Sequence, residues 1–273
     1  MGSGEVRGEA SGRRNSGRRW AILREVQRSQ RVSVSELSHS FGVSEVSIRR
    51  DLEHLHGMGL LRRVHGGAQA LAGPESSVFD ARLLANVEVK RALGEAAAVL
   101  VHPGNTILLD SGTTMLEIAR AIPRTLPQGG ALTVICRSLV IASELRAYRQ
   151  IRLIVLGGVY QHDYDAFVGS QIESMLQGLR ADILFIGSDG VTIDRGLTTD
   201  NVLEASLYQM LARSAERVVV AVDSSKIGVN KLQAILPFES VHTLITDCGA
   251  PQSFTGQLEE RGLEVILVPV KKR

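Results

Sequence analysis

The chain has 273 residues, of which 44% are hydrophobic and 22% charged, and its formal net charge is +2. This is the composition of an ordinary globular protein with room for two domains. The longest apolar runs, such as VVVAV at 218–222, fall far short of the ~20 residues that span a bilayer. The composition therefore excludes a membrane-spanning protein, and no membrane partner is expected.

Apart from Met1, the first seventeen residues contain Val6 as their only bulky apolar side chain, so segment 1–17 is predicted to be a disordered arm. No apolar segment of the signal-peptide type follows, and secretion is not expected. Cys136 and Cys248 lie far apart and outside any CxxC spacing. This arrangement favours reduced thiols and a cytoplasmic protein over a disulfide framework or a metal site, and no cofactor is expected.

Positive charge is concentrated at the N-terminal end. Residues 1–72 contain twelve Arg and no Lys against seven acidic residues, which gives +5, whereas residues 73–273 contain nineteen basic and twenty-two acidic residues, which gives −3. Short helical patterns fill 18–72, a segment rich in Gly, Ala, Pro and Ser leads into a linker placed at 73–85, and strands alternate with helices over 86–273. The asymmetry suggests a nucleic-acid partner for the domain at 18–72 and a different ligand for the domain at 86–273.

Two helices are predicted at the start of the first domain. Trp20, Ile22, Leu23 and Val26 recur at helical spacing and mark the first helix. Ser35 is the predicted N-cap of a second helix that turns its apolar residues Leu37 and Phe41 inward. Gly42 then allows a sharp turn.

The third helix is the predicted DNA reader. Ser44 is expected to cap it, and Ile48, Leu52 and Leu55 form its buried stripe. The residues that must point away from this stripe are Val46, Ser47, Arg49, Arg50 and His54. Free amides with Ser44 or Ser47 suit a phosphate, and an Arg fork suits O6 and N7 of a guanine in the major groove.

A basic hairpin is predicted to follow this helix. GLLRRVHGGAQAL is expected to form a strand, a tight His-Gly-Gly turn and a second strand. Arg62, Arg63 and His65 would lie near the DNA backbone as the wing of a winged helix-turn-helix. Two alternatives stay open: Arg49 and Arg50 could form a solvated face, with Arg50 paired to Glu53, or the winged helix could bind protein instead of DNA.

Seven short β-branched runs in the second domain predict strands. They lie at 106–110, 132–135, 152–156, 182–187, 217–222, 241–246 and 263–268. Amphipathic stretches such as VEVKRALGEAAAVL and NVLEASLYQMLARSAE separate most of them. Nearly continuous apolar strands that alternate with helices favour an α/β fold with a mainly parallel sheet covered on both faces.

Ligands of such sheets bind beyond the carboxyl ends of the strands, where the polar residues of this domain gather. The DSGTT segment would place amides and hydroxyls at a helix N-terminus, as a phosphate seat. Asp110 and Asp189 could take hydroxyls, and Lys226 would add positive charge. The predicted ligand is a phosphorylated sugar, held by Asp110, Ser111, Gly112, Thr113, Thr114, Arg137, Gly157, Gly158, Asp189 and Lys226. Taken singly, these residues also fit a helix cap, tight turns and a surface salt bridge.

The run VSVSELSHSFGVSEVSIRRDLEHLHGMGLLRRVHGGA resembles the N-terminal domain of the DeoR family of bacterial transcriptional regulators. The blocks LLDSGTTM, LIVLGGVY, FIGSDGVTIDRGLTT, VDSSKIG and LITD extend the resemblance over residues 18–250. It implies a DNA-binding repressor of carbohydrate metabolism, released from operator DNA by a phosphorylated sugar. A homo-oligomer is expected because one winged helix reads few base pairs.

The resemblance also implies that the second domain shares its fold with ribose-phosphate isomerase and glucosamine-phosphate deaminase. An isomerase or deaminase is therefore the alternative function. A deaminase-like loop would need a histidine soon after its Asp-Gly pair, and this chain has Val191 there, so no catalytic residues are assigned. The chain also has Cys136 and Arg137 where the family usually has Thr-Asn. Arg137 could either contact a phosphate or carboxylate or fill the space and alter the ligand class.

Overall fold

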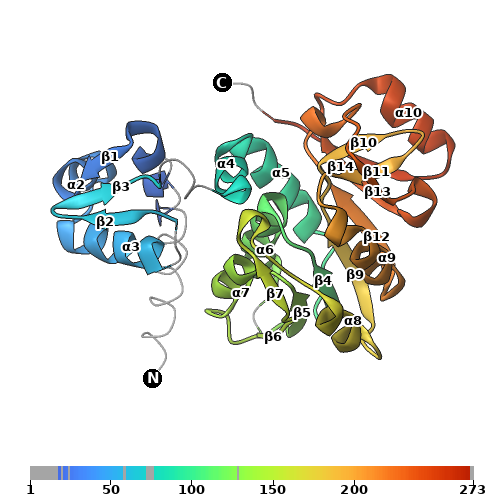
Figure 1. The fold of residues 1–273 in the computed structure, drawn as a ribbon, viewed down its shortest axis with the longest axis horizontal. Coiled ribbons are helices and arrows are strands. Elements are labelled where there is room, and N and C mark those ends of the chain that lie inside the picture. Colours follow the sequence, from blue (N-terminus) through green and yellow to red (C-terminus); the bar gives the residue numbers. More distant parts are fainter. Residues whose placement is uncertain are drawn as a thin grey trace. The chain divides into compact units, whose positions relative to one another are not determined.

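In a computed structural model of the chain, the structure describes residues 18–19, 21–23, 25–57, 60–71, 77–127 and 129–270. The chain divides into two compact units, residues 1–84 and 85–273, and Figure 1 colours them from blue to red along the sequence. The predicted arm at 1–17 and the predicted core residue Trp20 lie outside the described residues.

The first unit contains a winged helix-turn-helix. The described positions of 18–29 are helical, and α2 (Val34–Phe41) and α3 (Glu45–Gly57) follow. The strands β1 (Arg31–Ser33), β2 (Arg62–Val64) and β3 (Gly67–Gln69) form an antiparallel sheet in the order β1-β3-β2. Fully buried aliphatic side chains make its core: Ile22, Leu23, Val26, Leu37, Ile48, Leu52, Leu55 and Leu61. The predicted burial of these helix residues is thus confirmed, whereas Phe41, predicted to point inward, is half-buried.

The cap of α2 differs from the prediction. Ser33, not Ser35, is the N-cap: its Oγ accepts the Glu36 N–H at 3.1 Å, and the Glu36 carboxylate accepts the Ser33 N–H at 2.7 Å. Ser35 lies exposed inside the first turn. This reciprocal capping box requires an acid at the third helical position, which only the Ser33 register supplies. Gly42 ends the helix in the left-handed region, with φ of 61°, as predicted.

The wing is a hairpin with a two-residue turn, His65 and Gly66, so the second glycine of the predicted turn belongs to β3. A Cβ on that residue, Gly67, would lie 2.0 Å from the Val32 carbonyl oxygen of β1. Glycine is needed there because β3 passes close to β1, a strand that the sequence did not predict.

Part of the segment that composition predicted to be a linker is a helix. Within 73–85, α4 spans Val78–Leu84, and its start is capped by Ser77, whose Oγ accepts the Asp80 N–H at 3.0 Å. The Asp80 carboxylate accepts the Ser77 N–H in return at 3.1 Å. This reciprocal cap explains why a helix begins directly after a Pro- and Ser-containing stretch.

The second unit is built on a seven-stranded sheet, and all of its pairings are parallel. Its order is β15-β14-β12-β9-β4-β5-β6. The strands are β4 (Thr106–Leu109), β5 (Leu132–Cys136), β6 (Ile151–Val155), β9 (Ala181–Ile186), β12 (Ala215–Ala221), β14 (Thr243–Asp247) and β15 (Glu264–Val268). Each overlaps one of the seven predicted runs, so the parallel α/β sheet is confirmed.

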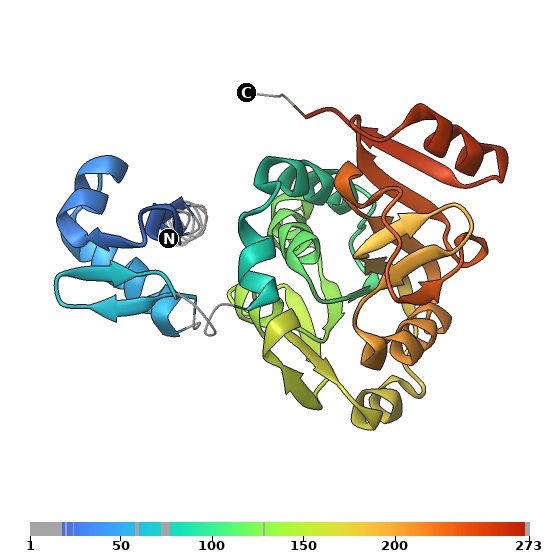
Figure 2. The ribbon, with the colours of Figure 1, turned by 45° about the horizontal axis from the view of Figure 1, so that its top comes forward.

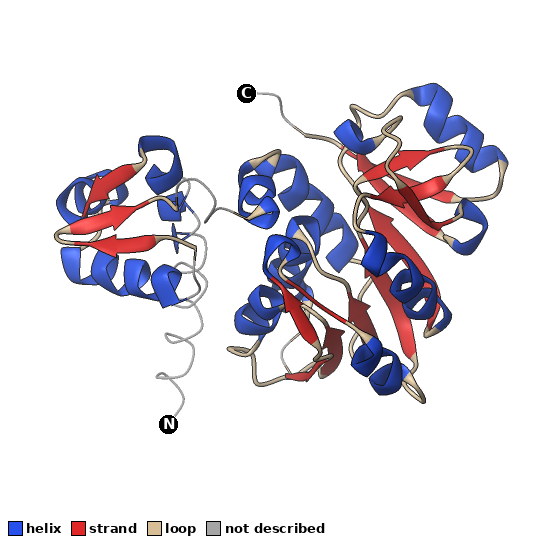
Figure 3. Ribbon diagram, in the orientation of Figure 1, coloured by secondary structure: helices blue, strands red, loops and turns tan. Residues whose placement is uncertain are grey.

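Helices lie on both sides of this sheet, as Figures 2 and 3 show. They are α5 (Val87–Ala98), α6 (Thr113–Thr125), α7 (Leu139–Leu145), α8 (Ser170–Leu176), α9 (Ala205–Arg213) and α10 (Gln252–Glu260). The central strands are buried on both faces; in β4, for example, Ile107, Leu108 and Leu109 are fully buried. Burial on both faces explains why these strands read as continuous apolar runs.

Two smaller sheets flank the carboxyl ends of the main strands. One is antiparallel, in the order β10-β11-β13, from β10 (Gly190–Thr192), β11 (Gly196–Thr199) and β13 (Gln233–Leu236). The other is the hairpin of β7 (Val159–Gln161) and β8 (Ala166–Val168). Short 3-10 helices complete the loops: η2 (His162–Tyr164), η3 (Val202–Glu204), η4 (Ser224–Lys226) and η5 (Phe238–Ser240).

The β7–β8 hairpin is fixed to the loop that follows β5. The Phe167 N–H donates to the Arg137 carbonyl at 2.8 Å. The buried Asp165 carboxylate accepts bonds from the Ser138 hydroxyl, the Val140 N–H and the Tyr160 hydroxyl. Asp165 has φ of 50°, a conformation that asparagine and aspartate tolerate better than other side chains. The hairpin therefore has a defined position next to the predicted ligand site.

Candidate functional site

Helix α3 presents a polar face to solvent. Ile48, Leu52 and Leu55 are fully buried, whereas Arg49 and Arg50 are exposed. The predicted reading face is therefore the solvent face of this helix. Val46, in the first turn, is 54% exposed.

The start of α3 is capped as predicted. Ser44 Oγ accepts the Ser47 N–H at 3.3 Å and lies 3.0 Å from the Ser47 hydroxyl oxygen. The first amides of a helix have no carbonyl partner within the helix and can donate to an anion. The two hydroxyls and these amides thus meet at one end of the predicted reading face.

The arginines near α3 differ in their partners. Arg49 Nη2 lies 2.5 Å from a Glu45 carboxylate oxygen one turn earlier. Arg63 donates to the Gly67 carbonyl at 2.8 Å, and its Nε lies 3.6 Å from Glu53. In the described part of the chain, Arg50 has no ion-pair partner. One alternative was that Glu53 pairs with Arg50. In the structure Glu53 lies beside Arg63 instead.

The remaining predicted DNA contacts lie at separate places of the same unit. Arg62 on β2 and His65 in the wing turn are exposed, and His54 is half-buried on α3. Ser35 is exposed on α2. These side chains stay predicted contacts.

Sequence reasoning missed an ion pair that anchors α3. Asp51 is 1% exposed, and its two carboxylate oxygens accept bonds from Arg18 Nε at 2.6 Å and Arg19 Nε at 2.9 Å. The signal was present in the sequence, because an Asp between the buried positions Ile48 and Leu52 requires a cation. These bonds tie the first helix to the reading helix.

In the second unit, the predicted phosphate seat is a helix N-terminus. Gly112 is the N-cap of α6, with φ of 108°, a backbone conformation that glycine allows. Ser111 and Thr113 are buried, while Gly112 and Thr114 are half-buried. Their position at the first turn leaves N–H groups without helical partners, as an anion requires.

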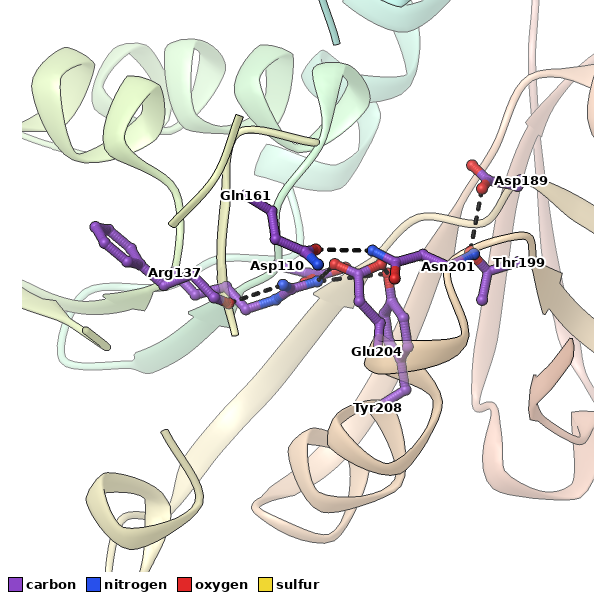
Figure 4. Close-up of polar contacts among 9 residues, drawn as sticks. Asp110, Arg137, Gln161, Asp189, Thr199, Asn201, Glu204 and Tyr208 are labelled. Carbon is purple, nitrogen blue, oxygen red and sulfur yellow. Dashed lines mark hydrogen bonds and ion pairs between the residues drawn. The ribbon is translucent and has the colours of Figure 1, made fainter. Parts of the chain in front are cut away.

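Arg137 lies beside Asp110, the residue that precedes this turn, as Figure 4 shows. It is fully buried, and its Nε donates to Asp110 Oδ1 at 2.6 Å. Nη1 donates to the Phe167 carbonyl at 3.1 Å, and Nη2 lies 2.9 Å from Glu204 Oε1 and 3.5 Å from the Tyr208 hydroxyl. Of the two predicted alternatives, the geometry favours the one in which Arg137 occupies space instead of reaching a ligand.

Two of the predicted ligand-binding residues bond to protein groups in this structure. Asp110 was expected to take ligand hydroxyls, but it is 1% exposed and bound to Arg137. Arg137 is predicted either to contact a ligand or to fill the space, and its donors point to protein groups. Together with Glu204 and Tyr208, these residues form a buried polar cluster beneath the strand ends, which we call the floor of the site.

The electrostatics of this floor follow from burial. Burial raises the pKa of Glu204 and of Tyr208, against the opposing effect of Arg137. Burial by itself would lower the pKa of Arg137, but Asp110 and Glu204 together hold it above its usual value. Glu204 Oε1 lies 2.9 Å from Arg137 Nη2 but has no aligned hydrogen bond among the described residues.

The other predicted residues lie around the floor. Asp189 is half-buried and accepts a bond from Thr199 Oγ1 at 3.1 Å. Lys226 is half-buried in η4, beyond the end of β12. Gly157 and Gly158 follow β6, and a Cβ on Gly158 would lie 2.5 Å from the Val168 carbonyl oxygen. Gly158 is therefore required for the close approach of β8.

Sequence reasoning missed four polar residues at this end of the sheet. Asn201 Nδ2 donates to Gln161 Oε1 at 2.9 Å and so joins η3 to the β7–β8 hairpin (Figure 4). Glu204 and Tyr208 stand four residues apart and both face Arg137. Their four-residue spacing on a predicted helix indicates that the two side chains lie on one face. The sequence does not indicate their partner, Arg137, because that residue lies far away in the chain.

Two kinds of feature are absent from the described residues. No group of three or more His, Cys, Asp or Glu side chains is placed to hold a metal ion. No helix there is long and apolar enough to cross a membrane.

Comparison with known proteins adds the family. The DeoR-like helix-turn-helix domain matches residues 18–72, and the DeoR C-terminal sensor domain matches residues 85–248. A relative from Escherichia coli O157:H7, which bears the name of an aga operon transcriptional repressor, is 34% identical over 98% of this chain and 99% of its own. The HTH-type transcriptional regulator GolR of Listeria innocua is 32% identical over 89% of this chain and 95% of its own.

Among solved structures, ribose 5-phosphate isomerase A from Methanocaldococcus jannaschii aligns with 52% of this chain and 55% of its own, at 22% identity and a TM-score of 0.39. The matching domains and full-length relatives are those of transcriptional regulators, not of enzymes. The chain belongs to the DeoR family of DNA-binding transcriptional regulators.

Proposed function

We propose that this protein represses a carbohydrate-metabolism operon and leaves its operator when a phosphorylated sugar binds to the second unit. The observation that carries the DNA half of the proposal is the exposed face of α3, with Arg50 uncommitted in the described part of the chain and a capped N-terminus beside it. The name of the Escherichia coli relative, a transcriptional repressor, supports a repressor.

The ligand half rests on the turn at the start of α6. Its free amides suit a dianionic phosphate, and the half-buried Thr114 can add a hydroxyl. Lys226 and Asp189 lie half-buried beyond other strand ends, where ligands of parallel sheets bind. In the floor, the positive charge of Arg137 is already paired with Asp110 and Glu204, so the floor offers no free cation to a phosphate. We therefore place the phosphate at the start of α6 and the sugar above the floor.

In this proposal the protein acts as a homo-oligomer in the cytoplasm. A single α3 reaches few base pairs, and paired half-sites give the required selectivity. The ligand needs only to bind one arrangement of the oligomer better than another. A coupling of ~1–3 kcal/mol changes operator affinity ~5- to 150-fold.

Retardation of the protein's own promoter DNA, with and without a panel of phosphorylated pentoses and hexoses, tests the proposal. We expect binding without ligand and release by one panel member, with the unphosphorylated sugar inactive. Lys226→Ala should weaken this response, whereas Lys231→Ala, which removes a surface pair with Asp200, should not. Promoter binding that no phosphorylated sugar changes would refute the ligand half.

A further inference from the structure

The solvent face of α3 contains one apolar side chain. The exposed residues of this helix, in the part that the structure describes, are Val46, Arg49, Arg50, Glu53, His56 and Gly57. Val46 is 54% exposed, although its helix has an apolar stripe on the opposite side. A branched apolar side chain among charged neighbours, in the first turn of the proposed reading helix, is placed to meet an apolar group of the DNA.

The major groove offers one such group. Base edges there present hydrogen-bond donors and acceptors, and the C5-methyl of thymine is the apolar feature. A valine placed over any other base edge would cover a polar group without bonding it, at a cost in free energy. The chemistry of Val46 therefore matches thymine alone among the four bases.

The neighbouring arginines fix where this contact lies. Arg49 is paired with Glu45 at 2.5 Å, whereas Arg50 has no ion-pair partner among the described residues. Arg50 lies four positions after Val46, so both side chains share one face of the helix, about 5–6 Å apart at Cβ. Base pairs follow one another every ~3.4 Å along the duplex, so this separation spans about two base steps.

We infer that Val46 selects a thymine through its C5-methyl group, within about two base pairs of a guanine bound by Arg50. This inference rests on the proposed operator binding by α3 and names part of the base sequence that α3 reads. Val46 is a specificity residue: its truncation removes the preference for thymine over a base that lacks the methyl group.

The experiment begins with selection of binding sites from a random duplex pool by the full-length protein. Each thymine of the selected half-site is then replaced singly by deoxyuridine, which deletes only the methyl group. We expect one position at which wild-type affinity falls about fourfold, the factor for burial of one methylene-sized group. Val46→Ala should bind thymine and uracil at that position equally well.

Two control variants complete the design. Val46→Ile keeps a branched apolar side chain and should keep the sensitivity to the methyl group. Val99→Ala truncates a 67% exposed valine of the second unit and should behave as wild type. Val46 is exposed, so its truncation should leave the unfolding transition unchanged, which shows that the variant is folded.

The inference is overturned if no thymine responds to loss of its methyl group, or if Val46→Ala responds as strongly as wild type. Either result would leave operator binding itself intact. A failure of the proposed function would give a different result from a failure of this inference. The selection would then enrich no sequence, and no salt-dependent binding to DNA would be measured.

Discussion

Arg137 and Asp110 form an ion pair that is closed to solvent, with 2.6 Å between Nε and Oδ1 and side chains that are 0% and 1% exposed. Glu204 approaches the same guanidinium at 2.9 Å. The pair therefore joins the ends of β4 and β5 to η3, beneath the proposed ligand site. Its role is to hold the floor of that site in one arrangement.

Arg137→Met should destabilise the second unit strongly, by about 3–5 kcal/mol, because Asp110 and Glu204 would remain buried without a cation. Glu204→Gln is the matched control. It removes one acidic group but leaves the Arg137–Asp110 pair intact, so its cost should be smaller than that of Arg137→Met. Urea unfolding followed by circular dichroism measures both. Equal losses would show that Glu204, not Asp110, is the main counter-ion.

Ser33→Ala should destabilise the winged helix by about 1 kcal/mol, because it removes the cap of α2. Ser35→Ala should change the unfolding free energy by less than about 0.5 kcal/mol, because Ser35 is exposed inside the first turn. Thermal unfolding of the two full-length variants compares them. A larger loss for Ser35→Ala would place the helix start two residues later.

Asn86 has φ of 52° and donates from Nδ2 to Asp223 Oδ1 at 3.1 Å, next to η4. Asn86→Ala should cost about 2 kcal/mol, from a lost hydrogen bond and a left-handed backbone that alanine disfavours. Asn86→Gly loses only the bond and should cost about 1 kcal/mol less. Denaturant titration of both variants gives the difference. If alanine proves as stable as glycine, the left-handed conformation does not matter for stability.

Burial raises the pKa of the Cys136 thiol to about 11, from an ordinary value of 9.0. Below pH 9 the thiol is protonated in both the folded and the unfolded chain. Between pH 9 and 11 only the unfolded chain loses the proton, so stability should fall by about 3 kcal/mol over this range.

Cys136→Ala should lack this part of the alkaline loss. The comparison of unfolding free energies at pH 8 and pH 11 isolates it, because all other titrating groups are common to both proteins. An identical pH profile for wild type and variant would mean that the thiol ionises as readily in the folded chain as in the unfolded one.

Much of the fold could be predicted because its elements have strong local patterns. The seven parallel strands are buried on both faces and so appear as continuous β-branched runs, each bounded by turn residues. The α3 stripe of Ile48, Leu52 and Leu55 repeats at helical spacing, and all three are fully buried. The short strands β1, β7, β8, β10, β11 and β13 were missed because three or four residues leave little periodicity. The equally short β2 and β3 could be predicted because a His-Gly-Gly turn signal lies between them.

The candidate site was predictable in its parts but not in its contacts. The strand ends and the Gly-Thr-Thr turn follow from topology, since parallel strands present their carboxyl ends at one edge. The pairing of Arg137 with Asp110 and Glu204 depends on tertiary packing of segments far apart in the chain. Desolvation there decides the role of Arg137, and no local pattern in the sequence reports it.

The central claim is that the exposed face of α3 enters a groove of operator DNA. A comparison of variants at Arg50 and Arg49 tests it most directly. Affinity of the full-length protein for its promoter DNA is measured as a function of salt, for wild type, Arg50→Ala and Arg49→Ala. We predict that Arg50→Ala abolishes sequence-specific binding while stabilisation by a bound phosphorylated sugar persists. Arg49→Ala should act more weakly, because Glu45 already neutralises that side chain. Specific, salt-sensitive binding by Arg50→Ala equal to that of wild type would contradict the account.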